Sequence, residues 1–263
     1  MASEQGSKVG VWSDLAAEIW QKRFEPQRGP LFQAVAEATR VSPGSSFLDA
    51  GCGGGGVALA AHRAGARVFG CDISDGVLAT ARRKVPAGEF KVGNLAALPY
   101  SDDSFETVVA CDCLLSPKDA RSAVLELSRV CAPAGQVCIV VWGEPKESDY
   151  SRVFDAMQSL LPTKPTVTPL AVSDAGVLDS LIAEAGLRIR VDQIVKLDYR
   201  FISFDDFWSC ARVLGGIKLI AEVAGEEKVR ATALQASRPC IREDGALVMK
   251  NTYRLIITNA KPQ

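Results

Sequence analysis

The chain has 263 residues, 48% of them hydrophobic, and its 30 Lys and Arg against 31 Asp and Glu leave a formal charge of −1. This length allows one large domain or two small ones, with a core that needs no disulfide or metal to fold. The charge balance argues against a generic polyanion binder, and charges interrupt every long apolar stretch, so no transmembrane helix is expected. The first residues lack a signal-peptide pattern, so we expect a cytoplasmic protein.

Five short strands are expected to alternate with helices in the first part of the chain. The strands are predicted at residues 45–50, 66–72, 89–92, 105–113 and 136–142. The helices are predicted at residues 11–24, 30–40, 55–64, 74–83 and 120–131. Ser74 can act as an N-cap, and Glu126 and Arg129 are expected to face water. Strands separated by helices form βαβ units and a mainly parallel sheet.

The pattern loosens after residue 142. Residues 143–170 are expected to form a loop with one short helix at 151–161. Further helices are predicted at 173–185 and 203–236, with a break at Gly215. Two late strands, 187–201 and 252–259, are expected to pair as an antiparallel edge of the sheet. The fold class is therefore α/β, a doubly wound, Rossmann-like, mainly parallel sheet of seven strands in a single domain with helical insertions.

Cysteine and histidine do not form a metal-ligating pattern. The chain has eight cysteines and one histidine, His62, but no CxxC pair and no Cys/His cluster. Structural zinc sites need such groupings, so we expect no metal and free thiols in a reducing compartment. His62 follows a run of small residues late in a predicted helix, where a solvated helix-end residue is the expectation.

A strand that ends in Asp49 continues directly into the glycine-rich segment 51–56. Ligands of open α/β sheets bind at this edge, where glycines let the backbone approach a ligand and adopt positive φ. A helix N-terminus there favours a carboxylate or phosphate. The glycine spacing also fits a dinucleotide fingerprint, so an NAD-dependent oxidoreductase remains an alternative. A dinucleotide loop has no need of Asp49, two residues before its first glycine.

The segment resembles motif I of class I S-adenosylmethionine (SAM) dependent methyltransferases, hydrophobic-Leu-Asp-x-Gly-x-Gly-x-Gly. Asp49, Gly51, Gly53 and Gly55 match this motif position by position. Asp72 ends a segment that is similar to the second strand of the family, whose terminal acid holds the ribose hydroxyls.

The resemblance continues downstream, and in all it spans about residues 45–142. Residues 93–106 resemble the family's stretch near the adenine, with Asn94 in place of an acid and Leu95 in place of a small residue. Residues 126–135 resemble the pattern E-x-x-R-V-L-K-P-G-G, with Ala134 in place of a glycine. Among subfamilies, the chain is similar to the type 11 group, related to ubiquinone and menaquinone C-methyltransferases.

The resemblance implies SAM as the cofactor and a set of residues that bind it. The implied cofactor-binding residues are Asp49, Gly51, Cys52, Gly53, Gly55, Asp72, Ile73, Asn94, Leu95, Cys111 and Trp20. Asp49 is either an anchor of the loop or the partner of the ammonium group of SAM, and both roles are compatible. Cys111 and Asp112 end the fourth strand, where the family lines the methionine side.

Segments outside this match are expected to cover the substrate. Residues 1–40 are expected to form N-terminal lid helices, and residues 143–172 and 203–245 to form substrate-cap insertions. Four aromatic residues are the substrate-binding candidates: Trp12, Phe204, Phe207 and Trp208. The alternative is that these aromatics only pack the insertion onto the sheet.

The expected function is methyl transfer from SAM to a small, apolar or aromatic metabolite, on carbon, nitrogen or oxygen. Orientation of the two reactants can supply roughly 7–11 kcal/mol of barrier lowering, and no catalytic residue is identified. The alternatives are an RNA or protein methyltransferase, the NAD-dependent oxidoreductase, and a SAM-binding module without activity. The neutral charge argues against a nucleic-acid partner. The sequence leaves the oligomeric state open.

Overall fold

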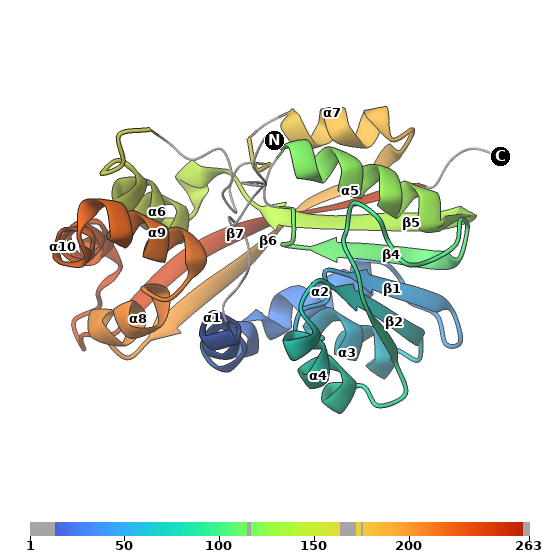
Figure 1. Ribbon diagram of the computed structural model, residues 1–263, viewed down its shortest axis with the longest axis horizontal. Coiled ribbons are helices and arrows are strands. Elements are labelled where there is room, and N and C mark those ends of the chain that lie inside the picture. Colours follow the sequence, from blue (N-terminus) through green and yellow to red (C-terminus); the bar gives the residue numbers. More distant parts are fainter. Residues whose placement is uncertain (1–13, 115–116, 164–171, 175, 260–263) are drawn as a thin grey trace, which may run out of the picture.

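A seven-stranded sheet forms the centre of the molecule, in the order β3-β2-β1-β4-β5-β7-β6 (Figure 1). The structure is a computed structural model that describes residues 14–114, 117–163, 172–174 and 176–259. The strands are β1 (Ser46–Ala50), β2 (Arg67–Asp72), β3 (Glu89–Val92), β4 (Phe105–Cys111), β5 (Cys131–Trp142), β6 (Arg188–Phe201) and β7 (Leu247–Asn259). β1 to β5 pair in parallel, whereas β7 is antiparallel to both of its neighbours. The expected mainly parallel sheet with antiparallel pairing at one edge is confirmed.

Helices cover both faces of this sheet. One face packs against α2 (Gly29–Ala38), α3 (Gly56–Arg63) and α4 (Asp75–Lys84), and the other against α5 (Pro117–Val130) and α7 (Val177–Glu184). In β1, Phe47 belongs to the first core and Leu48 to the second, and both are fully buried. Burial on both faces explains why the strands are apolar without alternation.

β6 and β7 are longer than their neighbours and extend past the carboxyl end of β5. They stay paired from Arg188 and Asn259 to Phe201 and Leu247, whereas β5 ends opposite Tyr253. Four helices gather around this projecting ribbon: α6 (Asp149–Gln158), α8 (Phe204–Ala211), α9 (Gly215–Ala224) and α10 (Glu226–Ser237). The ribbon therefore carries these cap helices beyond the edge where the parallel strands end.

The N-terminal segment lies between the cap helices and the body of the sheet (Figure 1). It runs through α1 (Asp14–Ile19), a π-helical turn at Trp20–Phe24 and a 3-10 turn at Glu25–Arg28 into α2. The backbone N–H of Arg200 in β6 donates a hydrogen bond of 2.7 Å to Gln27 Oε1. A π-helical turn is rare and frequently marks a functional site.

Two local expectations need correction. Ser74 is the N-cap residue of α4, but its side chain makes no capping hydrogen bond. Instead, the backbone N–H of Ser74 donates a hydrogen bond of 3.0 Å to the side chain of Asp72. β5 begins five residues earlier than expected, because Cys131 already pairs with Phe105 before a bulge shifts the register.

In the described part of the chain, no helix has the length and apolar character to cross a membrane.

Candidate functional site

The glycine loop after β1 adopts a backbone that other residues resist. Gly51, Gly53 and Gly55 have φ values of 74°, 51° and 80°. A Cβ on Gly51 would lie 2.7 Å from Cys113 Cβ, and one on Gly55 would lie 3.0 Å from Ala81, so packing excludes side chains at both positions. A Cβ on Gly53 would meet nothing within 4 Å. Gly53 therefore faces open space that a ligand can enter.

Backbone hydrogen bonds hold this loop against the end of β2. The N–H groups of Gly51 and Cys52 donate to the Cys71 carbonyl at 2.7 and 3.0 Å. The Gly53 N–H donates to Asp72 Oδ2 at 3.0 Å, while Asp72 Oδ1 takes the Ser74 N–H. Each carboxylate oxygen has a second lone pair, so the partly exposed Asp72 can still accept hydroxyl groups of a ligand.

Asp49 is buried beneath the loop and joins β1 to the first turn of α3. Its Oδ2 accepts from the Ala58 N–H at 2.9 Å. Burial, with the negative charges of Asp72 and Glu25 nearby, raises the pKa of Asp49 to about 7. A cation bound close by would favour the ionised form and lower this pKa.

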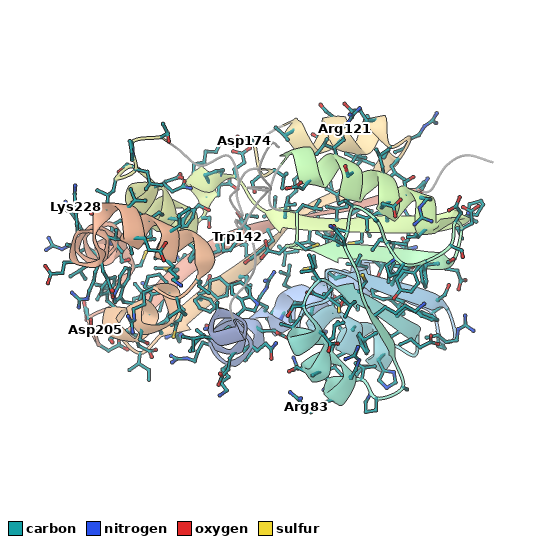
Figure 2. All side chains as sticks on the ribbon, viewed as in Figure 1. Arg83, Arg121, Trp142, Asp174, Asp205 and Lys228 are labelled. Carbon is teal, nitrogen blue, oxygen red and sulfur yellow. The ribbon has the colours of Figure 1, made fainter. Side chains whose placement is uncertain are left out.

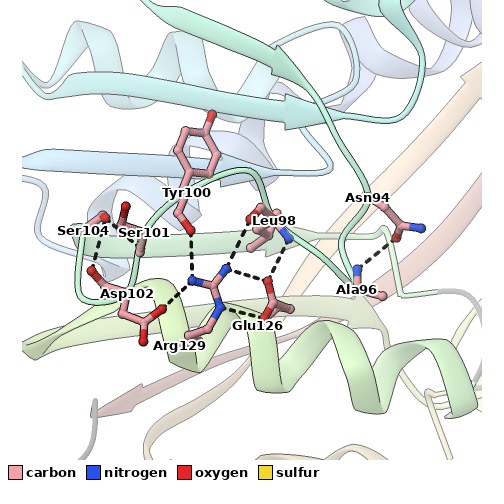
Figure 3. A network of polar contacts seen from close by, with 9 residues as sticks. All are labelled: Asn94, Ala96, Leu98, Tyr100, Ser101, Asp102, Ser104, Glu126 and Arg129. Atoms are coloured by element: carbon pink, nitrogen blue, oxygen red, sulfur yellow. Dashed lines mark hydrogen bonds and ion pairs between the residues drawn. The ribbon is translucent and has the colours of Figure 1, made fainter.

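The chain after β3 is held by a polar network centred on Arg129 (Figure 3). Arg129 donates to the carbonyl oxygens of Tyr100 and Leu98 and pairs with Asp102 and Glu126. Glu126 in turn accepts the Leu98 N–H at 2.8 Å. The sequence led us to expect that Glu126 and Arg129 face water, and this expectation is incomplete. They clamp the backbone of residues 98–102 to α5.

Asn94 uses its side chain to shape its own turn. Its Oδ1 accepts the Ala96 N–H at 2.9 Å (Figure 3). Leu95 is half-buried, and Ile73, which follows Asp72, is 69% exposed. The exposed, apolar side chain of Ile73 is therefore available to cover a flat ring of a ligand at this edge of the sheet. Contact of these three residues with an adenine stays a prediction.

A buried ion pair joins the end of β4 to the N-terminal segment. Asp112 has a positive φ of 56°, and its Oδ2 lies 3.0 Å from Arg28 Nη1. Burial raises the pKa of Asp112, and the guanidinium and the Trp142 side chain oppose that rise. Arg28 Nη2 lies 4.0 Å from Cys111 Sγ, which places the expected residue Cys111 in the same cluster.

Aromatic rings surround the Arg28 guanidinium. Its centre lies 5.3 Å from the ring centroid of Trp20, 5.7 Å from that of Phe32 and 5.3 Å from that of Tyr253. The hydroxyl groups of Tyr253 and Tyr199 are 2.8 Å apart and buried. No sequence motif identifies Arg28, Tyr199 or Tyr253 as functional residues. The only signal is the alternation of polar and apolar residues along the strands that carry the two tyrosines.

The expected substrate residues in the cap are part of its packed interior. Phe204, Phe207 and Trp208 are 6%, 0% and 6% exposed. Phe204 stacks on Trp208 with centroids 6.4 Å apart, and Phe207 packs edge-on against Phe201. Their contact with a substrate stays a prediction, and Trp12 lies outside the described residues.

The N-terminal segment and the cap share a hollow of about 320 Å³. Leu15 of α1 lines it together with Val213, Ala221 and four charged residues of the cap, which are Arg212, Lys218, Glu222 and Glu226. Trp20 is half-buried and stacks on Phe24 with centroids 5.1 Å apart. His62 is exposed near the C-terminal end of α3, the end remote from the glycine loop.

Taken together, the ends of β1, β2 and β4 present three carboxylates, Asp49, Asp72 and Asp112. Within the described residues, no cluster of His, Cys, Asp and Glu could hold a metal ion. The acids and the open glycine loop suit an organic ligand that carries hydroxyl groups and positive charge.

Comparison with known proteins gives one family. Residues 48–139 match the type 11 methyltransferase family, described as a methyltransferase domain. A demethylmenaquinone methyltransferase of Streptomyces avermitilis is 32% identical over 120 residues, which cover 46% of this chain and 52% of that protein. An uncharacterised protein of Mycobacterium tuberculosis is 31% identical over 122 residues, covering 45% and 44%. The chain thus spans about half the length of the curated relatives it matches.

Solved structures show the same fold over a longer stretch. The YcgJ protein of Bacillus subtilis has a TM-score of 0.62 at 20% identity, covering 88% of this chain and 98% of that one. The magnesium protoporphyrin IX methyltransferase of Synechocystis, solved with bound S-adenosylhomocysteine (SAH), has a TM-score of 0.59 at 15% identity, covering 94% and 93%. At such low identity these likenesses concern the fold alone.

Proposed function

We propose that this chain, whose residues 48–139 are a class I SAM-dependent methyltransferase domain of the type 11 group, transfers the methyl group of SAM to a small apolar or aromatic metabolite. The observation that carries the proposal is the glycine loop. Gly53 combines a positive φ with open space in front of it, directly beside the carboxylate of Asp72. A cofactor with ribose hydroxyls fits this combination.

The residues at the sheet edge divide the cofactor among them. Asp72 accepts the ribose hydroxyls, and Ile73, Asn94 and Leu95 border the adenine. The backbone of Gly51, Cys52, Gly53 and Gly55 lies along the methionine half, with Cys111 opposite. Asp49 is either an anchor of the loop or the partner of the ammonium group, and Trp20 covers the site from the N-terminal side.

SAM supplies a methyl group on a cationic sulfur. An electron pair of the acceptor forms the new bond to the methyl carbon, while the pair of the broken bond stays on sulfur. The residues of this chain bind and orient the two reactants and exclude water, since dispersal of charge in the transition state is favoured in a dry site. Asp72 and the ionised form of Asp49 provide a negative field for the positive charge of the cofactor, whereas Arg28 balances the charge of Asp112.

The cap and the N-terminal segment form the acceptor side. Support comes from the hollow that Leu15 shares with the Arg212 turn, because it places the N-terminal segment beside the cap. Phe204, Phe207 and Trp208 contribute to the acceptor side, either by contact with the acceptor or by packing behind the residues that contact it. An aromatic acceptor also agrees with the name of the Streptomyces relative, a demethylmenaquinone methyltransferase.

Calorimetric titration tests the proposal. SAM and SAH should both bind with saturation, while NADH, added as a control for the oxidoreductase alternative, should give no heat of binding. If neither SAM nor SAH shows saturable binding at millimolar concentration, the proposed function is refuted. Saturable binding of NADH in its place would assign the glycine loop to a dinucleotide.

A further inference from the structure

The sheet ends in β6, whose outer edge pairs with no further strand among the described residues. In that part of the chain, this edge makes one outward hydrogen bond, from the Arg200 N–H to Gln27 Oε1. Residues of an antiparallel strand bond alternately to one side and to the other. The even-numbered residues 192–198 therefore point their N–H and C=O groups outward, as Arg200 does. Such an unpaired edge can bind another strand.

Two features limit the free stretch of this edge to residues 191–198. At one end, the register with β7 shifts between Ile189 and Val191, so Arg190 is an extra residue, and its guanidinium turns back over the sheet to β5. At the other end lies the hydrogen bond to Gln27. A bulge commonly protects an edge strand, but between these two limits neither a bulge nor a proline interrupts β6.

The side chains on one face of this stretch alternate in charge around an apolar residue. Asp192, Lys196 and Asp198 are exposed and share a face with Ile194, which is 51% exposed. Asp192 pairs with Arg254 of β7 at 2.7 Å. Among the described residues, Lys196 and Asp198 form no ion pair. The edge therefore offers an acid, an apolar residue and a base in succession, next to ladder groups that point outward.

A second copy of the same strand fits this pattern in one antiparallel register. When Ile194 lies opposite its own symmetry mate, Asp192 of each copy lies directly opposite Lys196 of the other. A register centred on Val195 sets Asp192 opposite Asp198, and one centred on Lys196 sets that lysine opposite itself. A shift in the other direction leaves Asp192 opposite Ile194. Opposite charges directly across a ladder stabilise it and like charges destabilise it, so the register centred on Ile194 is favoured.

A hollow of about 440 Å³ beside β6 supports the same register. Its charged lining consists of Asp192, Glu144, Glu147, Asp179 and Arg254. Acids thus outnumber the single guanidinium, and Ile194 borders the same hollow. Lys196 of a second copy, placed opposite Asp192 on this face, brings a positive charge to the acidic lining. The two copies are therefore complementary in charge beyond the directly opposed pairs.

We propose that β6 binds β6 of a second copy of this chain in antiparallel orientation, centred on Ile194, and that one sheet then runs through a symmetric dimer. Such an interface is isologous, because each copy contributes the same surface. Main-chain hydrogen bonds of residues 191–197 supply the pairing, as in other cases of strand addition. The two strands run in opposite directions, so the two caps lie at opposite ends of the dimer. The inference goes beyond the proposed function and does not depend on it.

Sedimentation velocity of the full chain measures the dimer at protein concentrations up to roughly 100 μM, because a short ladder forms a small interface. We expect a concentration-dependent dimer of the wild-type protein. Lys196→Glu sets like charges opposite each other at two symmetric places, so it should raise the dissociation constant of the dimer about tenfold or more. Lys250→Glu makes the same change of charge on β7, away from the free edge, and should dimerise like the wild type.

A mixture of two variants tests the register. Asp192→Lys also sets like charges opposite each other, while Arg254 keeps its second partner, Asp179. Mixed in equal amounts, Asp192→Lys and Lys196→Glu restore both pairs of opposite charge, so the mixture should dimerise although each variant alone does so weakly. If both variants are folded and the mixture stays monomeric, the register and the proposal are wrong.

Ile194→Pro tests the ladder without a change of charge. Proline removes an N–H that points to the free edge and leaves the bonds to β7 in place. The dimer should be lost, while SAH binding and the melting temperature stay close to those of the wild type. A monomeric wild-type protein, or a dimer that persists in both Ile194→Pro and Lys196→Glu, overturns the proposal. If Asp192→Lys or Ile194→Pro fails to fold, equal dimerisation of Lys196→Glu and Lys250→Glu overturns it.

Discussion

The two sides of this molecule, a cofactor side and an acceptor side in the proposed function, are stabilised in different ways. On the cofactor side, backbone N–H groups of Gly51, Cys52 and Gly53 bond to fixed acceptors at the end of β2. On the acceptor side, rings from distant segments pack together, such as Phe24 against Tyr199 and Phe201. A site built from backbone geometry constrains its own short sequence, whereas a site built from side-chain packing can be filled in many ways. If this contrast holds, substitutions on the cofactor side should change SAM affinity more than substitutions on the acceptor side.

Gly53→Val should have the largest effect. The branched side chain enters the open space in front of the loop and resists the positive φ, so SAM affinity should fall by more than about 100-fold. Gly44→Val is the matched control, because Gly44 has a φ of 80° and also meets nothing within 4 Å, but lies at the opposite end of β1. Calorimetry should show normal SAH binding by the control. Equal binding by both variants would mean that Gly53 does not face the cofactor.

Asp72→Ala should weaken SAM binding roughly 10- to 150-fold, the value of one charge-assisted hydrogen bond. The variant should remain folded, although the loss of two backbone hydrogen bonds to its carboxylate lowers the melting temperature. Asp75→Ala removes an exposed acid three residues later and should leave the dissociation constant unchanged. An unaltered constant for Asp72→Ala would reduce Asp72 to a structural role.

Asp49 should make the stability of the protein depend on pH. Its pKa is raised in the folded protein, so its contribution to stability is present below about pH 4 and is lost as the pH rises to about 7. Asp49→Asn should remove this loss, measured as the difference between urea-unfolding midpoints of variant and wild type at pH 5 and pH 8. If the carboxylate also binds the ammonium group, wild-type SAM affinity should rise across this range and that of the variant should not. A flat difference in midpoints would show that Asp49 titrates normally.

Arg129→Met should raise the SAM dissociation constant only a few-fold. The variant frees the backbone of residues 98–102 without touching the cofactor, and hydrogen exchange of the Leu98 amide should accelerate. Arg121→Met on the same helix removes an exposed pair with Glu184 and serves as the control. Exchange at Leu98 that is equally slow in both variants would contradict the clamp.

Phe204→Leu should have the smallest effect on SAM affinity, within about twofold, while it lowers the melting temperature through lost packing in the cap. Calorimetry with SAH and a thermal melt measure the two quantities separately. A large loss of SAH affinity would break the contrast, since it would couple cap packing to the cofactor loop.

The sequence predicted the positions of the glycine loop and of the strand ends closely, because each of their residues meets a local constraint, whereas contact of these residues with the cofactor stays a prediction. Asp49 ends a strand, Gly53 needs a positive φ, and Asp72 ends the next strand, so spacing alone brings them to one edge. Asp72 as the partner of the Ser74 N–H was missed, because both serine and aspartate can satisfy a helix start and the sequence does not rank them. The clamp by Glu126 and Arg129 was missed because amphipathic spacing places a side chain on a face but does not name its partner.

The acceptor side was predicted only in outline. The insertion between the late strands was expected, yet Arg28, Tyr199 and Tyr253 were not, because they meet only through tertiary contacts. Arg28 is separated from Tyr253 by most of the chain, and nothing in the residues around either one signals the other. A buried arginine within an aromatic cluster is a property of the assembled fold.

The projecting ribbon has a consequence for how the acceptor side could be redesigned. Phe201 and Leu247 face each other as a register pair, so the chain leaves the sheet and re-enters it at the same point. Residues 202–246 can therefore be exchanged as a module, as an insert between two adjoining anchor points. The graft has to pack against α6, which contacts α9 and α10, and against β6, which contacts α8, and it has to replace the ion pair between Asp206 and Arg23. Such an architecture lets one catalytic body accept a succession of different caps.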